Sequence, residues 1–422
     1  MKLMNVKGTF DYMPKEMNLR NKIMATLRRN FEKYGYLPIE TPKLNYFDLL
    51  SYKYDDDAEI LNEIYHLTDQ GDRELGLRYD LTVPFCKVVG MNKGLSLPFR
   101  RYEMGPVFRN GPVKLGRTRE FYQCDVDVVG IDNRFIEAEQ ILMAINTYKE
   151  LGIDIFVRYN NRKLMSGLIL EAGIEEDLVS KVIGIIDKKE KVKKEDLILM
   201  LEDISISKES IDKLLAFFDQ NLDDYKKLNN PLIKEGLDEI LELQTYLKEL
   251  NILDDCLFTP TLARGLSIYT GIVFEFYDKK MRLSCAIGAG GRYNKIITNF
   301  MNNGMEYPAV GLSFGLEPIF VILSNEIGKE SLIDVLIVPL DTDCEALKLA
   351  NVLREKNIKV LIEMTKKKVG KCFEYAEREN IKYVMILGSN EINNGIYKIK
   401  DMQEKVEYSY NLEDLIKFLI RE

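Results

Sequence analysis

Apolar residues near the amino terminus recur with the period of a helix. Their spacings are four, four and three residues: Ile23, Leu27, Phe31 and Tyr34. This pattern places the side chains on one helical face. Pro14 can open such a helix and Gly35 can end it, so a helix is predicted over residues 16–34. The following YLPIETP is predicted to be extended, because Thr41 precedes a proline and is biased away from helical angles.

Short runs of β character follow between residues 76 and 130. They are LGLRYDLTVPF, RRYEMGPVF and REFYQCDVDVVG, and antiparallel hairpins are their natural interpretation. From residue 162 to about 250, Lys, Asp, Glu, Leu and Ile dominate, which predicts a helical insertion. Strand patterning returns in SIYTGIVFEFY and RLSCAIGAGGRY. Residues beyond the insertion are therefore expected to complete the first sheet.

The pattern changes again after a charged linker, SNEIGKES. DVLIVPL and YVMILG are apolar runs typical of strands covered on both faces, IKVLIEM is a more polar strand, and CEALKLANVLR is an amphipathic helix. This alternation predicts a small α/β domain with a parallel sheet. We expect two domains, residues 1–325 with the insertion at 162–250, and residues 332–422.

Composition narrows the classes of function. The chain has 59 Lys+Arg and 67 Asp+Glu, so its net charge is 59 − 67 = −8, and any contact with nucleic acid must be local. The six cysteines lie far apart without a CxxC pair, which argues against a zinc ribbon or a small disulfide scaffold. His66 is the only histidine. A two-histidine metal site within one chain is therefore impossible, and His66 itself is expected at the surface or partly hydrogen-bonded.

The amino terminus does not have the pattern of a signal peptide. MKLMNVKGTFDYMP places Gly, Asp and Pro where such a peptide needs an apolar stretch, and no run of the chain approaches about 18 apolar residues. A cytoplasmic protein without a membrane partner is expected.

The stretch most informative about chemistry is PVFRNGPVKLGRTREFYQCDVDVVG, residues 106–130. Its cations surround a glycine-containing hairpin loop: Arg109, Lys114, Arg117 and Arg119. Gln123, Asp125 and Asp127 occupy alternate positions of the outgoing strand and so share one face. One hairpin could thus offer cations to phosphates and acceptors to a small cationic group. An exposed basic hairpin with solvated acids is the simpler alternative.

Two further clusters lie beyond the insertion. TLARGLSIYTGIVFE carries Arg264, Ser267, Tyr269 and Thr270 at the entrance to a strand. AIGAGGRYN compresses three glycines before Arg292 and Tyr293, which lets the backbone approach a ligand or another strand closely. Because glycines are also common at hairpin bends, this second cluster is a weak signal alone.

Together these motifs resemble the class II aminoacyl-tRNA synthetases, and among them the histidyl-tRNA synthetase family. KGTFDYMP resembles the family's amino-terminal signature, and the first helix with YLPIETP resembles motif 1. FRNGPVKLGRTREFYQCDVD resembles motif 2, LARGLSIYTG the histidine-specific loop, and AIGAGGRYN with PAVGLSFGLEPI the approach to motif 3. The resemblance implies an α+β, antiparallel-sheet catalytic domain with a helical insertion, followed by an α/β anticodon-binding domain.

The resemblance also implies a role for each matching residue. Arg109 and Arg264 would be catalytic, holding and stabilising the histidine carboxylate and the ATP α-phosphate. The histidine-binding residues would be Asp80 and Thr82 at the α-amino group, Gln123, Asp127, and Tyr269 and Tyr293 at the imidazole. The ATP-binding residues would be Arg109, Arg119 and Phe121, with Phe121 stacked on adenine.

The implied reaction requires ATP with Mg²⁺ as substrate, and no protein side chain is assigned to the metal. The implied partners are histidine, tRNA(His) and a second copy of the chain, because Pro42 in motif 1 implies a homodimer. Within TKKKVGK, four lysines are the candidates for tRNA phosphate: Lys366, Lys367, Lys368 and Lys371. The lysine-rich DKKEKVKKED, residues 187–196, is a second candidate, although a mixed-sign run is usually a solvated helix face.

The sequence departs from the family pattern at three places. Pro318 stands where motif 3 has an arginine that packs against adenine, and proline has neither charge nor donor. Gly111 stands where a glutamate near adenine is common, and Ser267 and Ile268 stand where Asp and Tyr are usual. Losing one charge-assisted contact costs about 1.5–3 kcal/mol, which weakens ATP binding without abolishing catalysis.

Three functions remain possible for such a sequence. One is a histidine–tRNA ligase, favoured by the motif 2 cations and by the extra α/β terminal domain. The other is a catalytically inert paralogue that serves as the regulatory subunit of ATP phosphoribosyltransferase, favoured by Pro318, Gly111 and Ser267. A protein that senses free histidine or uncharged tRNA is a third alternative.

Overall fold

The computed structural model describes residues 2–52, 59–114, 116–189, 192–264 and 268–421. The chain divides into two compact units. Unit 1 contains Met1–Phe10 and Ile23–Ile322, and unit 2 contains Asp11–Lys22 and Leu323–Glu422. Among the helices within these ranges, none is long and apolar enough to cross a membrane.

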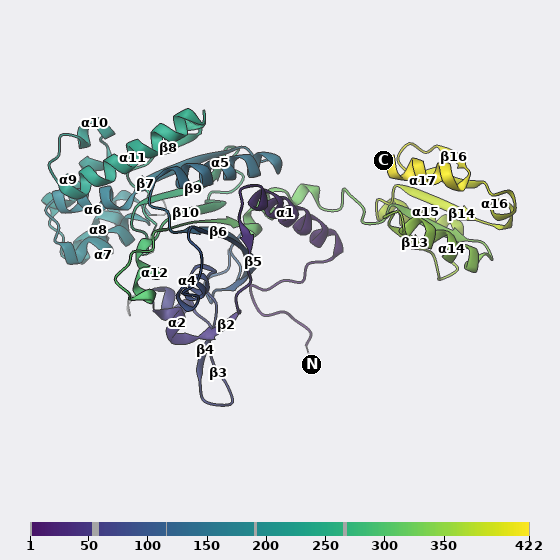
Figure 1. The fold of residues 1–422 in the computed structure, drawn as a ribbon, viewed down its shortest axis with the longest axis horizontal. Helices are drawn as coiled ribbons and strands as arrows, with labels where there is room; N and C mark the ends of the chain where they lie inside the picture. Colours follow the sequence, from purple (N-terminus) through teal and green to yellow (C-terminus); the bar gives the residue numbers. More distant parts are fainter. Residues whose placement is uncertain (1, 53–58, 115, 190–191, 265–267, 422) are drawn as a thin grey trace. The chain divides into compact units, whose positions relative to one another are not determined.

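Unit 1 is built on an eight-stranded sheet (Figure 1). Its strands, in spatial order, are β1 (Leu37–Pro38), β5 (Phe99–Phe108), β6 (Glu120–Val129), β11 (Ala309–Gly315), β10 (Gly288–Arg292), β9 (Ile272–Asp278), β7 (Ile155–Asn161) and β8 (Cys256–Phe258). The six central strands are antiparallel to their neighbours, and only the edge strands β1 and β8 pair in parallel. The predicted antiparallel sheet, completed by residues beyond the insertion, is thus confirmed.

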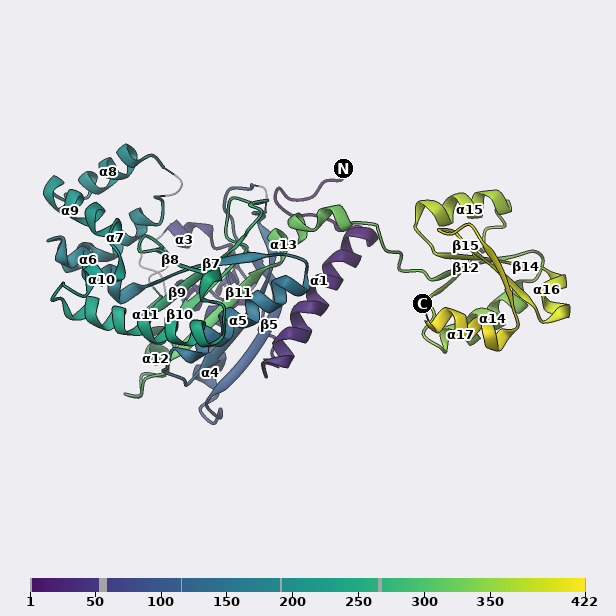
Figure 2. The same ribbon diagram turned by 90° about the horizontal axis from the view of Figure 1, so that it is seen from above.

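One face of this sheet is apolar and is covered by α5 (Phe135–Glu150) and by the part of α1 (Pro14–Lys33) that belongs to unit 1, as Figures 1 and 2 show. Ile23, Leu27 and Phe31 of α1 are fully buried, as the helical period predicted. The Phe31 ring lies 5.6 Å from that of Tyr102 and 5.5 Å from that of Phe314. Because side chains alternate across a strand, the opposite face is free to carry different residues, and it carries the polar ones of β5 and β6.

On this polar side lie α4 (Thr82–Met91) and α12 (Asn294–Met301), with a small sheet of β2 (Leu44–Tyr46), β4 (Glu74–Leu77) and β3 (His66–Thr68). The short helices α2 (Phe47–Ser51) and α3 (Glu59–Glu63) connect its strands. His66 is exposed on β3, and its ring packs 4.3 Å from that of Phe47. Buried residues of α4 and α12 pack against β6 and β11: Phe85, Cys86, Val89, Ile296 and Ile297.

The β interpretation of LGLRYDLTVPF was wrong beyond Leu77, because its second half is helix α4. Pro84 is the third residue of that helix, where a missing N–H breaks no helical hydrogen bond. Oδ1 of Asp80 accepts a hydrogen bond from the Val83 N–H at 3.0 Å, which supports the helix start as a capping residue does. The β-branched residues obscured this helix in the sequence.

Among the described residues, six α-helices lie in the range of the predicted insertion. They are α6 (Arg162–Glu171), α7 (Val179–Ile186), α8 (Lys194–Asp203), α9 (Lys208–Phe218), α10 (Leu222–Tyr225) and α11 (Pro231–Glu249). Asn161, Ser207 and Asn230 cap α6, α9 and α11 with their side chains. Figures 1 and 2 both place α6 to α10 together beside α11.

Unit 2 contains a five-stranded sheet in the order β13 (Val360–Ile362), β12 (Val335–Pro339), β14 (Tyr383–Leu387), β15 (Tyr397–Asp401) and β16 (Glu407–Tyr410). The first three strands are parallel, as predicted, but β15 and β16 pair antiparallel. The prediction rested on apolar runs, and β15 is not one, because its residues Lys398 and Lys400 alternate with apolar ones; this alternation is typical of a strand with one face toward solvent.

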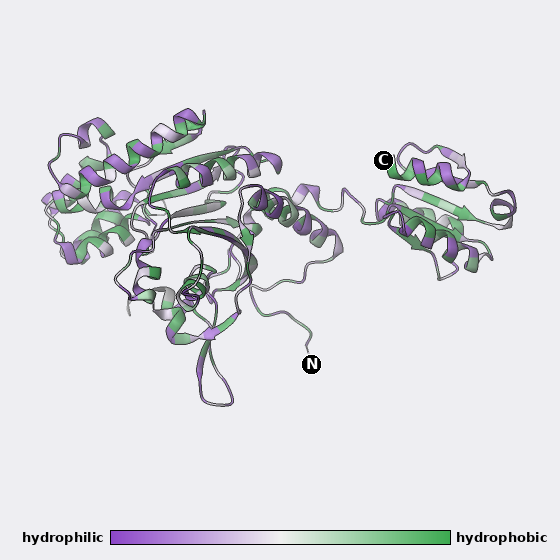
Figure 3. Cartoon of the chain, viewed as in Figure 1, coloured by the Kyte–Doolittle hydropathy of each residue, from purple (hydrophilic) through white to green (hydrophobic). Residues whose placement is uncertain are grey.

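Both faces of this second sheet are covered. Alternate residues of β12 face α14 (Asp343–Arg354) and α17 (Leu412–Arg421) on one side and α15 (Val369–Arg378) on the other. In Figure 3 these helices carry hydrophilic and hydrophobic residues in alternation, which is the pattern of helices with one buried face. The remaining helices are α13 (Leu316–Ile322), which follows β11 in unit 1, and α16 (Ser389–Asn394).

Candidate active site

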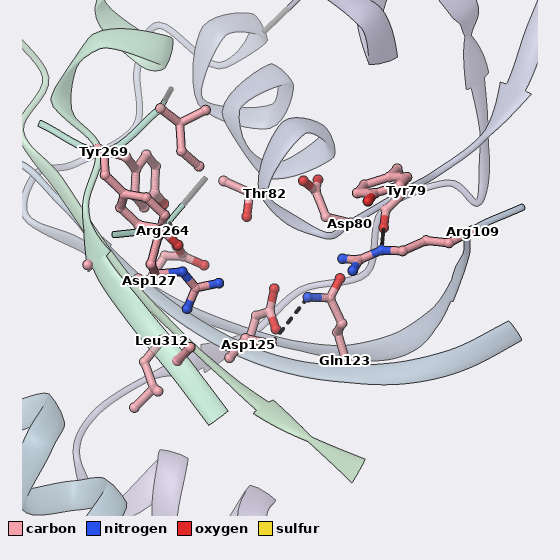
Figure 4. Close-up of a pocket in the computed structure, with 16 residues that line it drawn as sticks. Tyr79, Asp80, Thr82, Arg109, Gln123, Asp125, Asp127, Arg264, Tyr269 and Leu312 are labelled. Atoms are coloured by element: carbon pink, nitrogen blue, oxygen red, sulfur yellow. Dashed lines mark hydrogen bonds between the residues drawn. The ribbon is translucent and has the colours of Figure 1, made fainter. Parts of the chain in front are cut away.

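One face of β6, β11 and β10 forms the floor of a cavity in unit 1 (Figure 4). Gln123, Asp125 and Asp127 of β6 share this face, as their alternate positions predicted, and they pair with Gly315, Ser313 and Gly311 of β11. Eight residues that the sequence marked as site residues line the cavity: Asp80, Thr82, Arg109, Gln123, Asp127, Arg264, Tyr269 and Tyr293. Segments from both sides of the insertion thus meet at one place.

The cavity also has lining residues to which the family resemblance gave no role: Tyr79, Asp125, Ile268, Ala289, Gly291, Gly311, Leu312 and Ser313. Asp125 carried a detectable signal, because it stands between Gln123 and Asp127 on the same strand face. Leu312 and Ser313 sit in an ordinary apolar strand run, AVGLSFG, and nothing in that run distinguishes them from core residues.

Arg109 enters the cavity from the end of the β5–β6 hairpin. Its guanidinium carbon lies 4.2 Å from the centre of the Tyr79 ring and 4.9 Å from that of Phe121. Its Nε donates a hydrogen bond to the Tyr79 carbonyl oxygen at 3.2 Å. Two aromatic faces attract the cation, so the guanidinium is fixed with its remaining N–H groups directed into the cavity (Figure 4).

Arg264 enters the same cavity from another side (Figure 4). Its guanidinium carbon lies 5.2 Å from the centre of the Tyr269 ring, and among the described residues its buried Nη1 has no hydrogen-bond partner. Burial by itself lowers the pKa of Arg264, but Tyr269 and Glu275 outweigh it and raise that pKa above its ordinary value. The group therefore stays charged and has donor capacity left for a ligand.

Asp127 is held by partners within the protein. Its Oδ2 lies 2.5 Å from Nη2 of the fully buried Arg101, and its Oδ1 accepts a hydrogen bond from the Tyr293 hydroxyl. A Cβ added at Gly311 would collide with Oδ1 of Asp127, so glycine is required at this close approach. Burial raises the pKa of Asp127, whereas Arg101 and Tyr293 lower it; the net shift is upward.

A second buried ion pair lies near the contacts of Asp127 with Arg101 and Tyr293. Arg78 and Glu103 are each 1% exposed, and Nη1 of Arg78 lies 2.8 Å from Oε1 of Glu103. Arg78 also donates to the carbonyl oxygens of Thr41 and Pro106. The pair therefore ties the segment before Asp80 to strand β5, and with it fixes one wall of the cavity.

Two predicted ATP-binding residues lie beside the cavity rather than in its lining. Phe121 stacks under Arg109, and Nε of Arg119 donates to the Gly111 carbonyl oxygen at 3.4 Å. Near them, a Cβ added at Gly111 would stand 2.5 Å from Oε1 of Glu63. A carboxylate from α3 thus occupies the space beside the position where the resemblance led us to expect a glutamate side chain.

The four lysines of TKKKVGK are exposed in unit 2, between β13 and the first turn of α15. Lys367 lies 3.8 Å from Glu363, and Lys371 lies 2.7 Å from Glu374. Within the part of the chain that the structure describes, no group of three or more His, Cys, Asp or Glu residues could hold a metal ion.

Comparison with known proteins accounts for most of the chain. The profile of the histidyl-tRNA synthetase family matches residues 8–319, and that of the anticodon binding domain matches residues 334–422. Histidine–tRNA ligase 1 of Bacillus cereus strain ATCC 14579 is 44% identical over 425 residues, which cover 99% of this chain and 100% of that protein.

The chain belongs to the histidyl-tRNA synthetase family. The crystal structure of a histidyl-tRNA synthetase from Nostoc sp. PCC 7120 has a TM-score of 0.85 at 28% identity, covering 100% of this chain and 99% of that one. A Bacillus halodurans structure described as an ATP phosphoribosyltransferase regulatory subunit/histidyl-tRNA synthetase has a TM-score of 0.77 at 19% identity, covering 92% and 98%. The latter likeness reflects the fold alone.

Within the histidyl-tRNA synthetase family, the departures noted in the sequence have distinct local settings. Pro318 is the third residue of α13, a position in the first turn that tolerates proline. The neighbouring Glu317 is 4% exposed and accepts hydrogen bonds from the Tyr122 N–H at 3.1 and 3.2 Å, so it braces β6. Ile268 is buried and lines the cavity, whereas Ser267 lies outside the described residues.

Proposed function

We propose that the chain is a histidine–tRNA ligase, which activates histidine with ATP and transfers it to tRNA(His). Family membership along the whole chain supports this activity. The observation that carries the proposal is the polarity of one cavity, lined by the cations Arg109 and Arg264 and by Asp80, Asp125 and Asp127. An amino acid is a zwitterion, and such a cavity offers each of its charged ends an opposite charge.

The two arginines would act on the charge that develops during activation. The substrate carboxylate oxygen forms a bond to the α-phosphorus of ATP as the bond to the β-phosphate oxygen breaks, and pyrophosphate leaves. Charge accumulates on the phosphoryl oxygens, where fixed guanidinium groups stabilise it without reorganisation. Mg²⁺ would enter with ATP as part of the substrate complex. The tRNA terminal ribose hydroxyl then attacks the activated carbonyl carbon, and AMP leaves.

The residue roles within this proposal follow the family pattern. Asp80 and Thr82 would bind the α-amino group, Gln123 and Asp127 the amino acid, and Tyr269 and Tyr293 would line the imidazole pocket. Arg119 and Phe121 would bind ATP, with adenine beside Phe121. The exposed lysines 366, 367, 368 and 371 would contact tRNA phosphate.

We further propose that the protein acts as a homodimer in the cytoplasm, where uncharged tRNA is available. Leu37 on β1 and Leu44 and Tyr46 on β2 are exposed large apolar residues of the motif 1 region and its neighbour. Burial of such side chains between two copies would stabilise the dimer.

Transfer of labelled histidine onto tRNA tests this function. Purified protein with ATP, Mg²⁺ and tRNA(His) should charge the tRNA, and it should exchange pyrophosphate into ATP only when histidine is present. Complete inactivity in both assays across a range of Mg²⁺ concentrations would overturn the proposal. Stimulation of ATP phosphoribosyltransferase by the inactive protein would instead support the regulatory alternative, which the comparisons do not favour.

A further inference from the structure

Both oxygens of the Asp127 carboxylate contact protein groups, although the contact of Oδ2 is an ion pair without hydrogen-bond geometry. Arg101 contacts its Oδ2 and the Tyr293 hydroxyl donates to its Oδ1. Arg101 is fully buried and reaches the cavity floor from β5, directly opposite Asp127 in the register of the two strands. Asp127 is therefore neutralised by the protein itself.

Asp125, two residues earlier on the same strand face, is in a different situation. It is 4% exposed, it lines the cavity, and among the described residues its Oδ1 has no hydrogen-bond partner. Figure 4 shows its carboxylate directed into the space between Arg264 and the Gln123 amide. A buried carboxylate oxygen without a partner is costly, so its place in the cavity points to a ligand that supplies the missing donor.

The groups around Asp125 leave its charge incompletely balanced. Those that face it or the same cavity come from several elements: Arg101, Glu103 and Arg109 from β5 and its loop, Asp80 from before α4, Asp127 from β6, Ser313 from β11, and Arg264 and Tyr293 from beyond the insertion. Glu103 is already paired with Arg78. Arg101 thus stands as the nearby cation for both Asp125 and Asp127.

The proton on Asp125 reflects this balance. The pKa of Asp125 is raised to about 7, because burial, Asp127 and Asp80 together outweigh the lowering by Arg101 and by a hydrogen bond with Ser313. Near neutral pH the empty cavity therefore holds a mixture of the protonated and ionised carboxyl group. A cation bound beside it would favour the ionised form.

We propose that Asp125 is a further substrate-binding residue, whose free oxygen accepts a hydrogen bond from the protonated amine of the bound amino acid. This inference rests on the proposed function. With the substrate carboxylate held by Arg109 and Arg264, the neighbouring amine falls toward the part of the floor that lies between Gln123 and Arg264. An ammonium group has three donors, and Oδ1 of Asp80 already accepts from the Val83 N–H. Asp125 supplies a second acidic acceptor.

If Asp125 binds the substrate amine, histidine binding should release a proton, which a merely structural role of Asp125 would not cause. Binding of the ammonium ionises the protonated fraction of Asp125, and the proton passes to the buffer. Histidine affinity should therefore rise as the pH increases from 6 to 8, because less of the binding free energy is spent on removing that proton.

Titration calorimetry with histidine alone, in two buffers of different ionisation enthalpy at pH 7, measures both affinity and proton release. Asp125→Asn keeps the shape of the side chain but cannot ionise. We expect it to raise the dissociation constant for histidine about ten- to a hundredfold and to remove the proton release that the wild-type protein shows. Asp212→Asn, an exposed acid in α9, is the matched control and should change neither quantity.

The outcomes separate this inference from the proposed function. Wild-type protein that binds histidine, with an Asp125→Asn variant of equal affinity and equal proton release, would overturn the role of Asp125 alone. Wild-type protein that does not bind histidine would overturn the proposed function and this inference with it. If the variant fails to fold, the pH dependence of wild-type affinity decides: a histidine affinity that does not rise between pH 7 and pH 8, where the free imidazole is already mostly neutral, contradicts the inference. The histidine imidazole titrates equally in all samples and cancels in the comparison.

Discussion

The Tyr79 hydroxyl donates a hydrogen bond to Oε2 of Glu63 at 2.9 Å, and this contact holds the Glu63 carboxylate beside Gly111. The Asn110 N–H also donates to the Glu63 carbonyl oxygen at 2.8 Å. A residue of α3 thus brings a negative charge to the loop in which this chain lacks the family's glutamate. The adenine amino group of ATP would find its acceptor in a residue far away in the sequence.

Replacing Glu63 tests whether its carboxylate takes the place of the glutamate expected at position 111. Glu63→Gln should raise the KM for ATP about tenfold, because one charge-assisted hydrogen bond is lost, and leave histidine affinity unchanged. Pyrophosphate exchange at varied ATP gives the KM. Gly111→Ala should have a similar effect, since its Cβ would stand 2.5 Å from Oε1 of Glu63 and displace it. Glu202→Gln, in α8, is the control; an unaltered KM in both test variants would contradict the role of Glu63.

Arg264 is expected to act on the transition state more than on the bound substrate. Arg264→Ala should lower the rate of histidine activation about a hundredfold while changing the dissociation constant for histidine far less. Pyrophosphate exchange and equilibrium binding together separate the two effects. Arg378→Ala, an exposed arginine in α15, should leave activation unchanged. Equal losses of rate and affinity in Arg264→Ala would refute the assigned role.

Restoring the motif 3 arginine should strengthen ATP binding. Pro318 lies in the first turn of α13. Backbone N–H groups in a first turn make no hydrogen bond within the helix, so the helix is compatible with either proline or arginine at this position. Pro318→Arg should therefore fold normally and lower the KM for ATP about tenfold, as measured by pyrophosphate exchange. Pro318→Gln separates the effect of charge from the effect of removing proline. If the arginine variant keeps the wild-type KM, another group already fills its place.

The buried pair of Arg78 and Glu103 should be essential for stability. Glu103→Gln leaves the Arg78 charge without its partner, and removing one member of a buried pair costs about 3–5 kcal/mol. Thermal or urea unfolding measures the loss. Arg78→Met combined with Glu103→Leu should be less destabilising than the sum of the single changes. Asp223→Asn, which breaks an exposed pair with Lys226, should have little effect.

The raised pKa of Asp125 should also appear in the stability of the free protein. The folded carboxyl group, with a pKa of about 7 against an ordinary value of 3.8, keeps a proton that the unfolded chain has lost between those two values. Its contribution to stability is complete below pH 3.8 and is lost as the pH rises through 7. At pH 8, the free energy of unfolding of Asp125→Asn should therefore exceed that of the wild type by up to about 4 kcal/mol. Urea unfolding measures this difference. An equal difference at pH 5 and pH 8 would argue against the pKa shift.

Local patterns predicted the first helix, the β5–β6 hairpin and the shared face of Gln123 and Asp127, because period and alternation are properties of neighbouring residues. The contribution of Glu63 could not be predicted in this way, since its position beside Gly111 depends on how α3 packs on the hairpin. The contact of Arg101 with Asp127 could not be predicted from the sequence either. Its strand was recognised, but which cation of RRYEM faces the cavity depends on the register with β6.

The topology of unit 1 also bears on synthesis of the protein on the ribosome. Gln123 donates to the Ser313 hydroxyl across 190 positions of the chain, and β6 gains its partner β11 only after the whole insertion has emerged. A nascent chain that ends within the insertion has neither β11 nor the lining residues beyond the insertion, such as Arg264 and Tyr269. Incomplete products of translation should thus be unable to sequester histidine or consume ATP.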